Sequence, residues 1–190
     1  MNARKTIVIL GGGIGGVVAA NVLAKRIGKK AKIMLIDKQK NHIYPPALLH
    51  LMLGERTTND IQKPLSLLKK KNVSVITGEV MEINVKEKIV TTTKHEFSYD
   101  YLVIALGTKL APETIPGLAK SGYNLYDLAS VERLRDAVSV FPGGKVAIVI
   151  SSLPFKCPAA PYEAAFLLDS FFTKRELSKK VELSIFTPEP

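Results

Sequence analysis

A short run of glycines between two apolar segments constrains this chain more than any other feature. Thr6–Leu10 is a continuous β-branched and apolar run, which is typical of a buried parallel strand. Gly11–Gly16 predicts a tight turn, and Val17–Ile27 carries apolar residues at helical spacing. Lys32–Ile36 is a second apolar strand, which ends at Asp37. Two such strands joined by a helix predict a βαβ unit with a right-handed crossover.

The spacing of the glycines, Gly-x-Gly-x-x-Gly, predicts a dinucleotide site. The first glycine permits the turn, the second lets the backbone approach a pyrophosphate, and the third allows close helix–strand packing. The acid that ends the second strand lies 21 residues after the last glycine, where a carboxylate accepts a hydrogen bond from a ribose hydroxyl. This carboxylate would repel a 2′-phosphate, which favours FAD or NAD over NADP. The predicted cofactor-binding residues here are Gly11, Gly13, Ile14, Gly15, Gly16, Asp37 and Lys38.

The composition excludes several other classes of protein. Hydrophobic residues make up 46% of the 190 residues, too many for a natively disordered chain. Cys157 is the single cysteine, which excludes a disulfide framework and a cysteine-rich zinc site within the chain. The three histidines show no metal-ligand spacing, so no metal site is expected. The uncharged stretch Thr6–Ala24 contains five glycines, which favours strand, turn and helix over a signal peptide or a membrane span.

The net charge of +10 is concentrated in the first part of the chain. Residues 1–75 carry 14 Lys and Arg against three acidic residues. Such asymmetry is compatible with a peripheral contact at an anionic membrane surface. Alternatively, lysines and arginines at the ends of two predicted helices stabilise the helix dipoles and need no partner. No nucleic acid is expected as a partner, and the expected location is the cytoplasm, with peripheral membrane contact as an option.

The remaining segments extend the α/β pattern. Short helices are expected within Tyr44–Leu53 and over Gln62–Lys71, followed by a strand and a β-meander over Glu79–Ser98. Further along, the pattern predicts a helix over Ser130–Val140 with Ser130 as its N-cap. The other expected elements are the strands Val73–Thr77, Tyr101–Ala105, Lys145–Ile150 and Val181–Phe186, and the helix Pro158–Thr173.

The meander, followed by "YLVIALGT" at 101–108 and by Ile115–Gly117, resembles the two-dinucleotide flavoprotein oxidoreductases. The resemblance implies a Rossmann-like α/β fold, in which a parallel sheet with a β-meander binds FAD and a second Rossmann-like unit follows. The implied boundaries are an FAD-binding domain at 1–110, a linker at 111–122 and an incomplete second dinucleotide-type domain at 123–190. A strand-end turn near the cofactor adds Val80, Ala105, Gly107 and Thr108 to the expected contacts.

The stretch from Asn41 to Ile61 resembles the sulfide:quinone oxidoreductases and the type II NADH:quinone enzymes. The resemblance implies that this loop approaches the isoalloxazine ring. Tyr44 and Pro45, with Pro46 beside them, are therefore expected to contact the flavin.

The second unit has no glycine from Lys145 to Pro190, so a nicotinamide dinucleotide is not expected there. Pro158 suits the first helical position, which would place Cys157 at the N-cap. A thiolate there would be stabilised by the helix end and by Lys156. From position alone, an inert, buried thiol is an equal alternative.

The segment "PFKCPAAPYEAA" at 154–165 resembles the sulfide:quinone oxidoreductases and the flavin subunit of flavocytochrome c sulfide dehydrogenase. The resemblance implies that Cys157 is half of a redox pair beside the flavin, with Glu163 facing the site or the crevice of the second domain. Sulfide or a small thiol would then supply electrons through Cys157 and FAD to a quinone. The quinone site and the partner cysteine would lie outside this chain.

Three hypotheses follow from the sequence. The first is an FAD-dependent oxidoreductase of the sulfide:quinone type, of which this chain is the N-terminal part, completed by a C-terminal half or by a second copy. The second is a type II NADH dehydrogenase or a disulfide reductase-like flavoprotein. The third is a non-catalytic nucleotide-binding module.

Overall fold

The computed structural model describes residues 4–189, which form two compact units. The first unit runs up to Tyr44 and resumes over Gln62–Lys109, whereas the second comprises Pro45–Ile61 and the chain from Leu110 onward. Both units combine helices with parallel strands, which confirms the predicted α/β class.

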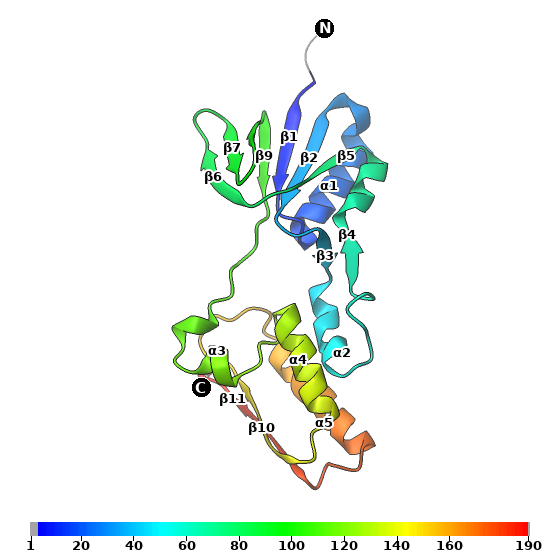
Figure 1. Ribbon diagram of the computed structural model, residues 1–190, viewed down its shortest axis with the longest axis vertical. Helices are drawn as coiled ribbons and strands as arrows, with labels where there is room; N and C mark the ends of the chain where they lie inside the picture. The colour runs from blue at the N-terminus through cyan, green and yellow to red at the C-terminus, as the bar shows by residue number, and fades with distance from the viewer. Residues whose placement is uncertain (1–3, 190) are drawn as a thin grey trace. The chain divides into compact units, whose positions relative to one another are not determined.

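A four-stranded parallel sheet forms the centre of the first unit (Figure 1). Its strand order is β5-β2-β1-β9, and helix α1 (Ile14–Ile27) connects β1 to β2 as predicted. In register, Ile7 of β1 lies opposite Ile33 of β2 and Tyr101 of β9. The strands span Thr6–Leu10 (β1), Lys32–Asp37 (β2), Val73–Thr77 (β5) and Tyr101–Ile104 (β9).

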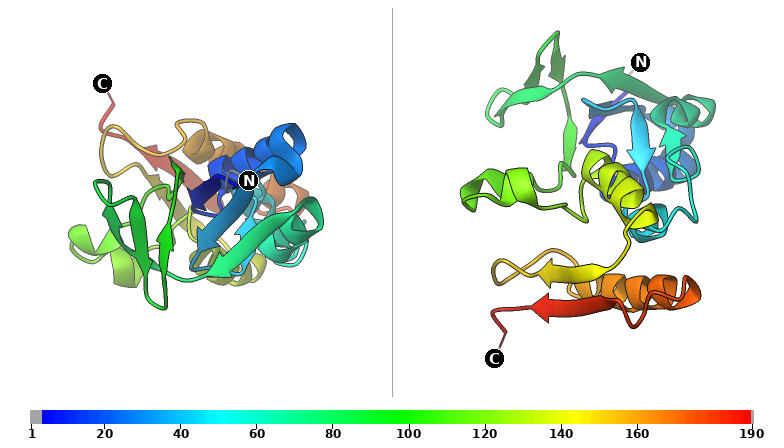
Figure 2. Two further views of the ribbon diagram at one scale, coloured as in Figure 1. Left: turned by 90° about the horizontal axis from the view of Figure 1, so that it is seen from above. Right: turned by 60° about the horizontal axis from the view of Figure 1, so that its bottom comes forward.

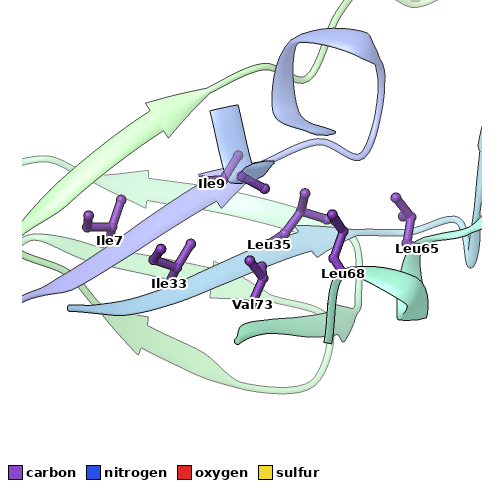
Figure 3. Close-up of a cluster of buried hydrophobic side chains, with 8 residues drawn as sticks. Ile7, Ile9, Ile33, Leu35, Leu65, Leu68 and Val73 are labelled. Carbon is purple, nitrogen blue, oxygen red and sulfur yellow. The ribbon is translucent and has the colours of Figure 1, made fainter. Parts of the chain in front are cut away.

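Both faces of this sheet are covered, which explains the continuous apolar run in β1. Ile7 and Ile9 pack on one face with residues of α1 and of the 3-10 helix η3 (Leu65–Lys71) (Figure 3). Val8 and Leu10 face the opposite side, where Val90 and other residues of a three-stranded meander cover them. The meander strands are Val80–Asn84 (β6), Ile89–Thr92 (β7) and Glu96–Ser98 (β8), paired antiparallel as predicted.

Two short strands between β2 and β5 in the chain form an antiparallel pair, in which β3 (Asn41–Ile43) pairs with β4 (Gln62–Pro64). The 3-10 helix η1 (Gly28–Lys30) follows α1 earlier in the chain. The helix predicted over 62–71 therefore begins only at Leu65. Pro64 has an extended backbone and no N–H to donate, so it ends the strand and precedes the helix.

The second unit contains another βαβ arrangement. Strands β10 (Gly144–Val149) and β11 (Val181–Phe186) pair in parallel and are connected through α5 (Ala160–Lys174) (Figure 2). The apolar side chains of α2 pack against α4 and α5, which is why the segment 45–61 groups with this unit. The other elements are η2 (Pro45–Ala47), α2 (Leu48–Met52), η4 (Pro112–Thr114), α3 (Leu118–Ser121) and α4 (Leu128–Ser139).

The unit boundaries and one helix cap differ from the sequence-based expectations. The segment 45–61 was assigned to the domain at 1–110, and the expected linker at 111–122 contains η4 and α3. The N-cap of α4 is Asp127, not Ser130, because the Asp127 carboxylate accepts the Ser130 N–H at 2.7 Å. Ser130 is buried, and its hydroxyl accepts the Asn124 N–H at 2.6 Å.

Within residues 4–189, no helix has the length and apolar character needed to cross a membrane.

The start of β1 is held to the start of β9 by Asp100. Its carboxylate accepts the Thr6 N–H at 2.8 Å and the Lys5 ammonium at 2.7 Å. The Lys5 hydrogen bond, followed by the Thr6 N–H, lowers the pKa of Asp100 below 3.8. The resulting stabilisation is present above pH 3.8 and is lost as the pH falls through the lowered pKa.

We expect Lys5→Met to raise the pKa of Asp100 toward its ordinary value, because the first of these interactions is removed while the Thr6 N–H remains. The side-chain carboxyl carbon signal of Asp100, followed by NMR against pH, measures the change. Lys94→Met, which removes a lysine from the meander instead, is the control. An identical Asp100 titration in Lys5→Met and the unchanged chain would contradict the assigned cause.

Candidate dinucleotide-binding site

Two glycines allow the turn after β1 to fold without a clash. A Cβ at Gly16 would lie 1.8 Å from the Gly11 carbonyl oxygen, so α1 can start this close to the turn only with glycine there. Gly11 has φ +101°, and a Cβ at this position would lie 2.2 Å from the Ala105 carbonyl oxygen. Ala105, at the end of β9, donates its N–H to Leu10 at 2.8 Å. The turn is therefore packed against two strand ends.

Gly13 differs from these two because its missing Cβ faces open space. Apart from the backbone of Gly13 and its chain neighbours, no atom lies within 4 Å of the position that a Gly13 Cβ would occupy. Gly13 is the N-cap of α1, and the first turn contains no acidic residue. The N–H groups of Ile14 and Gly15 precede the first intrahelical bond, which runs from Val17 to the Gly13 carbonyl at 3.0 Å. The turn thus offers an open, positive helix end that fits a pyrophosphate.

Asp37 supports this turn from the end of β2. Its Oδ2 accepts the Gly12 N–H at 2.5 Å, and its Oδ1 accepts the Gln39 N–H at 2.6 Å. Each carboxylate oxygen has a further lone pair, so Asp37 can accept a ribose hydroxyl while it holds the turn. The acid therefore has a structural contact in addition to the role expected from the motif.

His42 is a residue of this site that the sequence did not reveal. Its Nδ1 lies 2.9 Å from the Gly12 carbonyl oxygen. Since a carbonyl only accepts, the ring donates through Nδ1, and the two peptide groups that flank the Gly12 Cα are both held. Leu65 packs directly against Gly12, because its Cδ1 lies 2.4 Å from where a Cβ would be. A lone histidine in a three-residue strand carries no sequence signal for such a contact.

The structure places the other expected contacts of the first unit in different surroundings. Ala105 touches the turn, since its Cβ lies 3.5 Å from the position of a Gly15 Cβ. Lys38 forms an exposed ion pair with Glu79 at 3.1 Å, and Val80 packs into the cluster beneath the meander. Gly107 and Thr108 are exposed beyond the end of β9, and Tyr44 is exposed at the end of the first unit's opening segment.

Pro45 and the two expected catalytic residues, Cys157 and Glu163, belong to the second unit. Glu163 lies in the first turn of α5 with an exposed side chain. Cys157 is an exposed free thiol, which excludes the buried alternative.

The expected N-cap position of Cys157 is wrong. Helix α5 begins at Ala160, its N-cap is Ala159, and Pro161 occupies the first turn. Cys157 has φ +52° and its carbonyl accepts the Ala160 N–H at 3.0 Å, so it lies in a turn before the helix. The left-handed backbone at Cys157 prevents it from entering the helix as the cap, although the thiol still precedes the helix by only two residues.

Tyr126 and Lys156 surround this turn. The Tyr126 hydroxyl donates to the Lys156 carbonyl at 2.5 Å, and the Lys156 ammonium lies 5.7 Å from the centre of the Tyr126 ring. Burial, and then the negative charge of Cys157, raise the pKa of Tyr126. The phenol therefore anchors the backbone next to the thiol and lies within electrostatic range of it. The sequence did not predict this role of Tyr126, because Tyr126 is 31 residues away from Cys157 in the chain.

Comparison with known proteins decides the family. The model of the family described as pyridine nucleotide-disulphide oxidoreductase matches residues 5–150. The chain belongs to this family.

Among its relatives, a sulfide-quinone reductase from Aquifex aeolicus is 32% identical, and the alignment covers 98% of this chain and 44% of that protein. The crystal structure of the sulfide:quinone oxidoreductase from Aquifex aeolicus superposes with a TM-score of 0.84 at 28% identity, over 95% of this chain and 42% of that one. A type II NADH:quinone oxidoreductase from Mycobacterium tuberculosis is 32% identical over 57% of this chain and 24% of its own length.

This member of the pyridine nucleotide-disulphide oxidoreductase family spans about two fifths of the length of its sulfide:quinone relatives. The sulfide:quinone and type II NADH:quinone relatives are FAD-binding flavoproteins, which confirms the cofactor class expected from the sequence. The resemblance to sulfide:quinone oxidoreductases is likewise confirmed.

Substitutions at two glycines of the turn are expected to differ in their effect on stability. We expect Gly16→Ala to lower the free energy of unfolding by about 1–3 kcal/mol, because the new methyl group collides with the Gly11 carbonyl. Gly13→Ala is expected to change it by less than about 1 kcal/mol, since the methyl group enters open space. Chemical denaturation of both variants measures the difference, and equal losses would contradict this geometry.

The charge of Cys157 contributes to the raised pKa of Tyr126, so removal of the thiol should change the titration of the phenol. We expect Cys157→Ser to lower the pKa of Tyr126 only partway toward 10.0, because burial is the larger cause of the shift. The Tyr126 ring carbon signal, followed by NMR against pH, gives the value. Glu163→Gln, which removes an exposed charge from α5, is the control, and no difference between Cys157→Ser and the unchanged chain would contradict the contact.

Proposed function

We propose that this chain forms the FAD-binding part of an oxidoreductase of the sulfide:quinone type. The observation that carries the proposal is the turn at 11–16, which is open at Gly13 and held by Asp37 and His42. In this proposal the N–H groups after Gly13 bind the FAD pyrophosphate, and the Asp37 carboxylate accepts a ribose hydroxyl. When bound, FAD supplies the capacity to accept two electrons and to pass them on.

The finer part of the proposal concerns Cys157. The thiol is exposed, and Tyr126 and Lys156 hold the turn that carries it. In the proposed reaction, sulfide attacks a disulfide between Cys157 and a cysteine outside this chain, which breaks the S–S bond, leaves a persulfide on one cysteine and releases the other as a thiolate. Bound FAD would accept the two electrons that are released when the thiolate and the persulfide join in a new S–S bond, and a quinone would be the final acceptor. Tyr44, Pro45, Gly107 and Thr108 stay proposed flavin contacts, and Glu163 stays a proposed site residue.

The alternative is a type II NADH:quinone activity, which the similarity to the Mycobacterium tuberculosis relative supports. The segment between β10 and α5 contains no glycine, so it lacks the residue that lets a backbone approach a second pyrophosphate. This favours sulfide over NADH as the electron donor. The same proposal includes the location of the protein, which is cytoplasmic with peripheral contact at a membrane, where the quinone acceptor would be met.

Flavin absorbance tests the proposal in two steps. We expect the chain to bind FAD, and we expect Gly13→Ala to weaken binding about tenfold, equivalent to about 1.4 kcal/mol, because its methyl group fills the space left for the pyrophosphate. Fluorescence titration with FAD measures both affinities. A chain that binds no FAD would instead support a non-catalytic module.

In the FAD-loaded protein, anaerobic sulfide is expected to bleach the flavin. Cys157→Ser should keep FAD binding and abolish this bleaching, whereas Ser152→Ala, which changes an exposed hydroxyl before the same helix, should leave both unchanged. Bleaching by NADH alone would support the type II alternative. Full sulfide-driven bleaching in Cys157→Ser would exclude the proposed role of the thiol.

A further inference from the structure

Strands β1, β2 and β5 begin at the same end of the first unit's sheet (Figure 1). A basic pocket lies at this end. This is the opposite end of the strands from the glycine turn and Asp37, which follow the ends of β1 and β2. The pocket has a volume of about 370 Å³, which is in the lower range of small-molecule sites. Its polar lining comes from Arg4, Lys29, Lys32, Asn72 and Ser74.

The polar groups of this pocket have few partners within the protein. Arg4 donates only to the Lys29 carbonyl, at the long distance of 3.4 Å. Within residues 4–189, Lys29 and Lys32 form no ion pair, and the side chains of Asn72 and Ser74 make no hydrogen bond. Three cations, one amide and one hydroxyl thus line one hollow, and apart from the long Arg4 hydrogen bond their side-chain donors are free. This is the donor set that an oxyanion requires.

Acidic residues do not balance this charge. Between residues 4 and 44 and between 62 and 77, the only acidic residue is Asp37, at the other end of β2. Asp100 lies near the start of β1, but its carboxylate is already occupied by Lys5 and the Thr6 N–H. The cations of the pocket therefore have no neutralising carboxylate of their own.

The helix ends account for only a small part of the charge. The C-terminal ends of α1 and η3 lie beside this pocket, since Gly28 lines it and Asn72 caps η3. Each helix end carries at most about −0.5 of an elementary charge, so two ends offset about one cation. The cations that line the pocket and the hollow beside it are more numerous, namely Arg4, Lys29, Lys32 and Lys69. Dipole matching alone leaves most of this positive charge without a counterpart.

A second hollow continues the first along the edge of the sheet. It has a volume of about 520 Å³, shares Asn72 and Ser74 with the first, and extends to Lys69. A ligand with two linked anionic groups can therefore contact Lys29 and Lys32 with one group and reach toward Lys69 with the other.

We propose that this basic pocket binds the phosphate groups of a ligand that carries at least two negative charges. The site is separate from the proposed FAD site, because it lies at the opposite end of the same parallel strands. The guanidinium and ammonium groups supply the charge, while the Asn72 amide and Ser74 hydroxyl supply directed hydrogen bonds. The shared chemistry is a phosphate, carried either by a small soluble molecule or by a lipid headgroup.

Titration of the 190-residue chain with inorganic pyrophosphate, followed by amide NMR, tests the proposal. The signals of Lys29 and Ser74 report on this pocket, whereas those of Gly13 report on the FAD turn, so failure at one site is distinguishable from failure at the other. We expect Lys29 and Ser74 to shift, and we expect the Lys29→Gln/Lys32→Gln double variant to weaken binding about tenfold or more.

Lys86→Gln/Lys94→Gln is the matched control, because it removes the same charge from exposed positions of the meander. It should change the affinity by less than about twofold at physiological salt, where distant surface charges are screened. Equal weakening by both double variants, or no shift at Lys29 and Ser74, would overturn the proposal.

Vesicles distinguish the two sources of the phosphate. Pyrophosphate that binds while cardiolipin vesicles, whose headgroup carries two linked phosphates, do not would support a soluble ligand. Binding to cardiolipin vesicles that pyrophosphate reverses, with none to phosphatidylcholine, would support a lipid headgroup. Vesicle binding that the Lys29→Gln/Lys32→Gln variant retains in full would overturn this pocket as the phosphate site.

Discussion

The close approach of α1 to the end of β1 is the constraint on which the first unit depends. At Gly16 the helix backbone lies against the Gly11 carbonyl with no room for a side chain, and at Gly11 the chain passes beside the Ala105 carbonyl. Because both contacts involve backbone atoms, no rotation of a side chain can relieve a collision. This contact lets α1 start directly after β1, which pairs in parallel with β2 and β9, and the helix end at Gly13 is left open.

Two side-chain hydrogen bonds at Gly12 fix the conformation of the turn that the glycines make sterically possible. Asp37 accepts the N–H of Gly12 and His42 donates to its carbonyl, so the two peptide groups on either side of the Gly12 Cα are held from two strands. This leaves the neighbouring N–H groups of the helix end for a ligand. The Asp37 carboxylate holds the turn and can also accept a ribose hydroxyl. The same side chain thus serves both the conformation of the turn and the binding of the cofactor. The basic pocket at the opposite end of the sheet has no such internal partners.

Much of the first unit could be predicted because the sequence patterns that indicate it involve residues close to one another in the chain. The apolar runs at 6–10 and 32–36, the glycine spacing and the acid at 37 each report on neighbouring residues, and the structure places them as expected. The meander was also predictable, since its strands alternate and are separated by short turns. Helix starts were harder, because Asp127 and Ala159 take the cap positions expected for Ser130 and Cys157.

The sequence by itself determined the βαβ unit, the dinucleotide turn and the family resemblance, because these depend on residue types at fixed short spacings. Only the tertiary structure decided that His42 contacts Gly12, that Tyr126 anchors the turn before Cys157, and that 45–61 groups with the second unit. It also decided that Arg4, Lys29 and Ser74 line one pocket. These residues are distant in the chain, and only the pairing of strands and the packing of helices bring them within reach of one another.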